Sequence, residues 1–183
     1  MAEITLGILL NSFIIRSRLW RVKGKHLTAT SIPLGNYTFN NFLDIVVVGQ
    51  FAYITTSRGT VFRVNLGDIS LECIYTIHKG PVTSLDGTDR LFVSGSMDSF
   101  VRVWPNDFSD YFLEAQHTSP VLKAKLAPNE EKVLLLTQNG LIGTLDIKHH
   151  NFRALQRCYT ASISAFANNT HYGEFAMVTS QWC

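Results

Sequence analysis

The chain has 183 residues, of which 46% are hydrophobic and 16% charged, and its formal net charge is +2. This composition allows a buried core and excludes the charge-rich tails typical of disordered proteins. The three cysteines, Cys73, Cys158 and Cys183, lack the spacing of a metal site and cannot all pair within the chain. Free thiols are usual in a reducing compartment, so we expect a cytoplasmic protein.

The N-terminal stretch 4–15 is apolar, but Asn11 and Ser12 interrupt it and Glu3 precedes it. It lacks the basic start and cleavage site of a signal peptide, and it is too short to span a bilayer. We therefore interpret it as strand material and expect no membrane association. Residues 1–22 are interpreted as the tail of one repeat unit, followed by a polar loop from Lys23 to Asn41.

Four apolar, β-branched stretches follow, and Gly and Asn turns separate them. They predict strands over 42–48, 51–56, 60–65 and 71–77, which form one antiparallel unit over 42–77.

The next unit, 78–116, has the most distinctive pattern. His78 opens it, an apolar strand follows, and the small-residue strand Ser94-Gly95-Ser96 turns at Asp98. A β-branched strand then ends in Trp104.

This pattern repeats. Aligning Arg63-Val64-Asn65 with Arg102-Val103-Trp104 gives a period of 39 residues (102 − 63), and aligning Gly143-Thr144-Leu145 with the same triplet gives 41 (143 − 102). His117 follows His78 by 39 residues (117 − 78). A third unit therefore covers 117–158, and half of another covers 159–183.

The order of parts from His78 to Trp104, repeated at this period, resembles a blade of the WD-repeat β-propellers. The resemblance implies an all-β fold with three whole blades and two partial ones in one propeller. Propellers need at least about four blades to close. We therefore expect a piece of a longer propeller that, because of its open sheet edges, does not form a stable monomer by itself.

The resemblance also implies a polar network inside the second unit. His78, Asp98, Trp104 and a hydroxyl from Ser94 or Ser96 would form a hydrogen-bonded chain. The same residue types could form a catalytic triad, but the blade explains them structurally, and we expect neither catalysis nor a cofactor.

The other two units have lost parts of this set. The alignments above place Gly59 and Asn65 at the Asp and Trp positions of one unit, and Asn139 and Leu145 at those of the other. The repeats are therefore divergent.

Two further groups of polar residues are candidate sites. His149, His150 and His171 have no Cys or carboxylate at ligand spacing, so we interpret them as solvent-facing loop residues and expect no metal site. A basic stretch contains five cations and one Trp: Arg16, Arg18, Arg21, Lys23 and Lys25, with Trp20. It could bind RNA phosphates, bind an acidic protein surface such as that of tubulin, or be a solvated strand end.

Together these features predict a non-catalytic protein–protein interaction scaffold within a larger assembly. The chain is similar to the long WD-repeat proteins of centrioles and of ciliary or flagellar doublet microtubules, so a cytoskeletal location with tubulin as a partner is the first hypothesis. A WD-repeat subunit of an RNA-processing or ubiquitin-ligase complex is the alternative, and an enzymatic propeller is a more distant one.

Overall fold

The computed structural model describes residues 6–9, 18–23, 25–37, 40–157, 163–169 and 174–179. Within these ranges every regular element is a β-strand except one 3₁₀ turn, η1 (Gly35–Tyr37). All strand pairs are antiparallel. The prediction of an all-β propeller fold is thus confirmed. No helix in the described ranges has the length and hydropathy needed to cross a membrane.

Three sheets have four strands each, and we name them the first, second and third blades. The first contains β4 (Phe42–Val48), β5 (Phe51–Thr56), β6 (Thr60–Asn65) and β7 (Ser70–Thr76). The second contains β8 (Val82–Gly87), β9 (Leu91–Ser96), β10 (Phe100–Pro105) and β11 (Leu113–Gln116). The third contains β12 (Val121–Leu126), β13 (Lys132–Thr137), β14 (Leu141–Asp146) and β15 (Asn151–Arg157).

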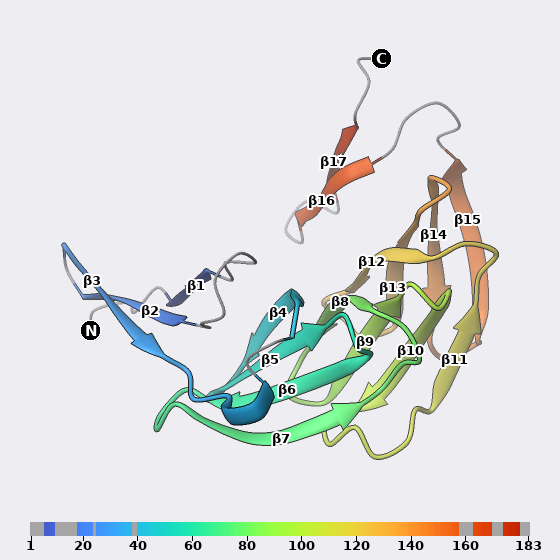
Figure 1. The fold of residues 1–183 in the computed structure, drawn as a ribbon. Coiled ribbons are helices and arrows are strands. Elements are labelled where there is room, and N and C mark those ends of the chain that lie inside the picture. The colour runs from blue at the N-terminus through green and yellow to red at the C-terminus, as the bar shows by residue number, and fades with distance from the viewer. Residues whose placement is uncertain are drawn as a thin grey trace.

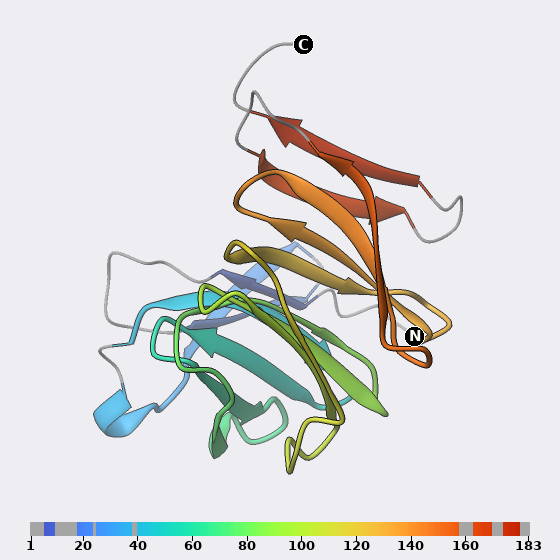
Figure 2. The same cartoon turned by 90° about the vertical axis from the view of Figure 1, so that its right-hand side faces the viewer.

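Smaller sheets lie at the two ends of this row. One consists of β1 (Leu6–Leu9), β2 (Arg18–Lys23) and β3 (His26–Ser31), and the other of β16 (Ile163–Asn169) and β17 (Glu174–Thr179). The five sheets follow one another in chain order along an open arc (Figures 1 and 2).

The strand register makes the repeat visible. In each blade the second and third strands form a central hairpin. In the first blade Thr55 pairs with Val61 next to its turn, and Val101 and Ile142 occupy the position of Val61 in the second and third blades. All three are buried, and they are spaced by 40 residues (101 − 61) and 41 residues (142 − 101). We call the first strand of each blade (β4, β8 or β12) its innermost strand. Each of the three carries an irregularity near its start, which shifts its pairing with the second strand.

This register corrects one part of the sequence alignment by one residue. Val64 pairs with Ala52, as Trp104 pairs with Phe92, so Val64 and not Asn65 occupies the tryptophan position. The Arg-Val dipeptides at 63–64 and 102–103 suggested a match that the hairpin geometry does not permit. By the same register Arg58 takes the place of Asp98, and Gly59 that of Ser99.

Gly59, Ser99 and Gly140 all have a left-handed backbone, with φ of 79°, 72° and 76°. Glycine adopts this conformation without a Cβ penalty, which explains its presence at two of the three turns.

A second correction concerns residues 23–41, which were expected to form a polar loop. Strand β3 occupies His26–Ser31 and pairs with β2 along its whole length. Its six side chains are all exposed, so it lacks the apolar alternation from which a strand would be predicted.

The hydrophobic core lies between consecutive blades. One cluster joins Val93 and Val101 of the second blade to Leu135 and Leu145 of the third. Another joins Tyr53 and Val61 of the first blade to residues of the second. Such packing holds each blade in place by its neighbours.

Hydrogen bonds from the innermost strands also join each blade to the next. Asp44 Oδ2 accepts from the amide of Leu85 at 3.3 Å, and Asp86 Oδ2 accepts from that of Leu126 at 2.9 Å. The Ser84 hydroxyl bonds both the amide and the carbonyl of Ala124 at 3.1 Å. In these three contacts the receiving strand contributes backbone groups. Ion pairs add to them, with Lys125 Nζ 3.3 Å from Asp86 Oδ1 and Lys123 Nζ 3.1 Å from Asp44 Oδ2.

Candidate functional site

The second blade contains a buried chain of hydrogen bonds. Trp104 Nε1 donates to Ser94 Oγ at 2.8 Å, and Ser94 Oγ lies 2.8 Å from His78 Nε2. His78 Nδ1 lies 2.9 Å from Asp98 Oδ2. Because an indole only donates and a carboxylate only accepts, the protons are assigned: Ser94 donates to Nε2, and Nδ1 donates to Asp98.

Four of the five residues expected in this network therefore form one chain, and the fifth has a different contact. Ser96 Oγ accepts from the backbone amide of Asp98 at 3.1 Å and so shapes the turn. Asp98 also accepts from the amide of Phe100 at 3.1 Å. The sequence left Ser94 and Ser96 as alternatives, because both follow the same alternation along β9.

The network has the hydrogen-bond order of a Ser-His-Asp triad but not its accessibility. The Ser94 side chain is fully buried and His78 is 4% exposed. Burial lowers the pKa of His78 below its ordinary value, despite the opposing effect of Asp98. A neutral imidazole that accepts from Ser94 at a site closed to substrate holds the blade together, and this arrangement favours a structural role.

Two charged residues extend the network, and the sequence analysis did not find them. Arg102 donates to the carbonyl of Ile77, next to His78, and its Nε donates to Glu114 Oε2 at 2.6 Å. Arg63 and Glu72 form a similar cross-strand pair in the first blade, at 2.8 Å. A basic residue on the third strand followed by an acidic residue on the fourth was the available signal.

In the other blades apolar side chains replace the polar chain. The register places Ile54 and Val64 of the first blade at the positions of Ser94 and Trp104. Leu135 and Leu145 take these positions in the third blade, and all four residues are buried. These two blades therefore lack both the hydroxyl and the indole, so no indole N–H is left unpaired at these positions.

His117 retains the position of His78 without its partners. Its Nε2 is buried and has no hydrogen-bond partner among the described residues, because Leu135 stands where the serine would be. Burial lowers the pKa of His117. Its ring packs edge-on against Phe152, with centroids 4.8 Å apart.

The basic stretch is only partly covered by the structure. Arg16 lies outside the described residues, and only the backbone of Arg21 and Lys23 is described, on β2. Arg18 and Lys25 are exposed. Trp20 is partly buried, and Leu19 beside it is fully buried against the first blade.

The expected loop histidines and cysteines show no clustering in the described ranges. His149 and His150 lie exposed in the turn between β14 and β15, where His149 contacts Asp146 at 3.0 Å. His171, Cys158 and Cys183 lie outside the described residues, and Cys73 is free. In the part of the chain that the structure covers, no three His, Cys, Asp or Glu side chains gather as a metal site would require.

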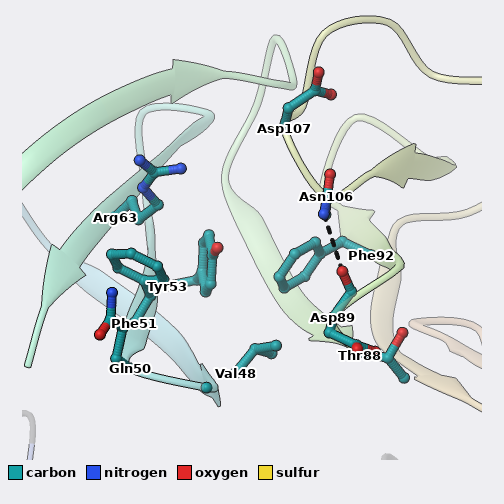
Figure 3. A pocket seen from close by; sticks show the side chains of 11 residues that line it. Val48, Gln50, Phe51, Tyr53, Arg63, Thr88, Asp89, Phe92, Asn106 and Asp107 are labelled. Atoms are coloured by element: carbon teal, nitrogen blue, oxygen red, sulfur yellow. Dashed lines mark hydrogen bonds between the residues drawn. The ribbon is translucent and has the colours of Figure 1, made fainter.

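A pocket of about 410 Å³ opens between the first and second blades (Figure 3). Aromatic side chains of β5 and β9 line it, and the turns β4–β5 and β8–β9 and the segment after β10 surround its mouth. Sequence analysis did not predict this pocket, because its lining residues come from two units.

Comparison with known proteins gives relatives over most of the chain. WD repeat-containing protein 90 of Xenopus tropicalis is 26% identical over 192 residues, which cover 89% of this chain and 10% of that protein. The human protein of the same name is 26% identical and covers 88% of this chain. Among solved structures, the β-propeller domain of Myceliophteria thermophila Cps50 (Swd1) matches with a TM-score of 0.67 at 17% identity, over 76% of this chain and 49% of that one. The chain has a β-propeller fold and is similar to WD-repeat proteins.

Further matches agree with this assignment. The chain is 31% identical over 107 residues to Centriole proteome protein 16 of Chlamydomonas reinhardtii, a match that covers 58% of this chain and 5% of that protein. A chain of a mitotic checkpoint complex matches with a TM-score of 0.74 at 11% identity, over 88% of this chain and 53% of that one. The chain spans about a tenth of the length of its WD repeat-containing protein 90 relatives. No family model matches it.

Proposed function

We propose that this WD-repeat chain is a non-catalytic protein–protein interaction scaffold within a larger assembly of centrioles or of ciliary and flagellar doublet microtubules, where it contacts tubulin. The observation that carries the proposal is the similarity of the chain to Centriole proteome protein 16 and to WD repeat-containing protein 90.

The geometry supports a scaffold role in two ways. First, the only Ser-His-Asp arrangement found in the described residues is buried and serves the blade. Second, consecutive blades share cores and backbone hydrogen bonds, so their loops are held in fixed relative positions. A rigid array of loops can bind a partner with little loss of conformational entropy.

The basic stretch provides the candidate tubulin contact. Arg18 exposes its cation at the start of β2, and Lys25 exposes its own in the turn between β2 and β3. A positive surface attracts an acidic protein in a salt-dependent manner. Co-sedimentation of the full-length protein with taxol-stabilised microtubules tests this contact. We expect pelleting at low salt that is lost when Arg16, Arg18, Arg21, Lys23 and Lys25 are replaced by Gln.

A matched control replaces cations elsewhere, at Arg90 and Lys148, and should pellet like the unmodified protein. Microtubule binding that is unaffected by the five replacements would contradict the proposed contact. Salt-sensitive binding of single-stranded RNA that maps to the same stretch, without microtubule binding, would favour the RNA-processing alternative. A tagged protein absent from centrioles and axonemes in cells would contradict the proposed location.

A further inference from the structure

The pocket between the first and second blades has an aromatic wall. Phe51, Tyr53 and Phe92 form a continuous series, with ring centroids 6.5 Å apart for the first pair and 4.5 Å for the second. Figure 3 shows Tyr53 and Phe92 side by side, which agrees with their ring contact. Aromatic faces carry partial negative charge and therefore attract cations.

The mouth of the pocket is acidic. Asp89 and Asp107 line it from the second blade, and both are exposed. Neither carboxylate forms an ion pair with any residue that the structure describes. A hydrogen bond from the backbone of Ser109 lowers the pKa of Asp107, so this carboxylate is ionised at neutral pH.

The one cation in the lining already has an anionic partner. Two N–H groups of Arg63 donate to Glu72 Oε2, at 2.8 and 3.1 Å, and its guanidinium lies 4.8 Å from the centroid of the Phe51 ring. An anionic ligand would have to compete with Glu72 for Arg63. A cationic ligand, in contrast, finds two unpaired carboxylates.

The acidic side of the mouth is also positioned before any ligand arrives. Asn106 Nδ2 donates to the carbonyl of Asp89 at 3.0 Å and links the two segments that bear the carboxylates. The wall below is rigid because Tyr53 and Phe92 belong to the core between the blades. A preorganised site binds a flexible ligand more tightly than a mobile site does.

We propose that this pocket binds an arginine or lysine side chain presented by an extended segment of a partner protein. Phe92 is fully buried and Tyr53 is 5% exposed, so the aliphatic part of the side chain would pack mainly on the partly exposed Phe51 ring. Its charged end would reach Asp89 and Asp107. The inference rests on the proposed scaffold function and specifies the chemistry of one partner contact.

The test uses an array of nonapeptides with a central arginine and varied uncharged flanks, and a matched array in which citrulline replaces the arginine. Citrulline keeps the shape of the side chain and removes its charge. The full-length protein should bind a subset of the arginine peptides about tenfold more tightly than their citrulline counterparts, as expected for one charge-assisted hydrogen bond.

Asp89→Asn combined with Asp107→Asn should abolish this preference. Both replacements are isosteric, and the backbone carbonyl of Asp89 and the acceptor oxygen at position 107 remain. Asp110→Asn is the matched control, because Asp110 is exposed in the same loop but does not line the pocket. It should leave the preference unchanged.

Three outcomes would contradict the inference: equal binding of arginine and citrulline peptides, an arginine preference that survives the double replacement, or its loss in the Asp110→Asn control. Microtubule co-sedimentation separates this inference from the proposed function. If the double variant loses the peptide preference and the unmodified protein does not bind microtubules, the pocket stands and the tubulin contact fails. If microtubule binding persists without any arginine preference, the reverse holds.

Discussion

Removing the Ser94 hydroxyl is the most direct test of the buried network. Ser94→Ala leaves the indole N–H of Trp104 without an acceptor and His78 Nε2 without a donor, since Ser94 is the hydrogen-bond partner of both. A buried polar group that loses its partner costs about 1–3 kcal/mol, so two such groups, partly relieved by small shifts, predict a loss of ~2–4 kcal/mol.

Hydrogen–deuterium exchange of the full-length protein measures this loss locally. We expect the opening free energies of amides in β9 and β10 to fall by that amount, with a smaller change in β14. Ser57→Ala serves as the control, because Ser57 is partly exposed and its hydroxyl forms no hydrogen bond with any residue that the structure describes.

A double-mutant cycle then isolates the shared contact. In the Ser94→Ala background the indole N–H is already unpaired, so Trp104→Phe should cost less than it does in the unmodified protein, by about 1 kcal/mol or more. Opening free energies within about 0.5 kcal/mol of the unmodified protein, the usual range for harmless surface changes, would refute the network. Strict additivity of the two replacements would refute the shared hydrogen bond.

Three further predictions concern pH, the turn and the blade interface. Burial lowers the pKa of His78 and of His117, so as pH falls the unfolded state binds protons before the folded state does. The free energy of unfolding should therefore fall as pH decreases below about 6.5. An unchanged urea midpoint between pH 7.5 and 5.5 would contradict this. Asp98→Ala removes the acceptor of His78 Nδ1 and should destabilise the second blade by about 1–3 kcal/mol in urea unfolding, without altering the third blade's exchange protection. Gly95→Ala would place a Cβ 2.7 Å from Val121 Cγ1 and should lower the free energy of unfolding by about 1–3 kcal/mol. Val121→Ala in the same protein should recover part of this loss, and no recovery would show that the contact is not its cause.

Local sequence patterns predicted the strands of the first blade well. The bounds of β4, β5 and β6 agree with the apolar stretches 42–48, 51–56 and 60–65, because glycine and asparagine turns delimit each one. β3 was missed, since its side chains are all exposed and give no alternation of polar and apolar residues. Its position depends on pairing with β2, which is a tertiary property.

The site was predictable only where residue identity is tied to a turn. The positions of His78, Asp98 and Trp104 follow from the blade pattern. Ser94 and Ser96 share a face of β9, so the choice between them depends on which hydroxyl the indole of Trp104 reaches. The inter-blade pocket depends on two units that are distant in sequence, as do the bonds from Asp44 and Asp86. The residue pattern within one repeat unit does not predict contacts between two units.

The bonds between innermost strands have a consequence for how such repeats diverge. The receiving strand offers an amide or a carbonyl, which every residue other than proline supplies in the same way. Substitution at Leu85, Ala124 or Leu126 therefore leaves the hydrogen bond in place, provided that the new side chain fits the core. A row of blades joined in this way can lose its signature residues one unit at a time and still keep its geometry, so sequence identity falls much faster than shape.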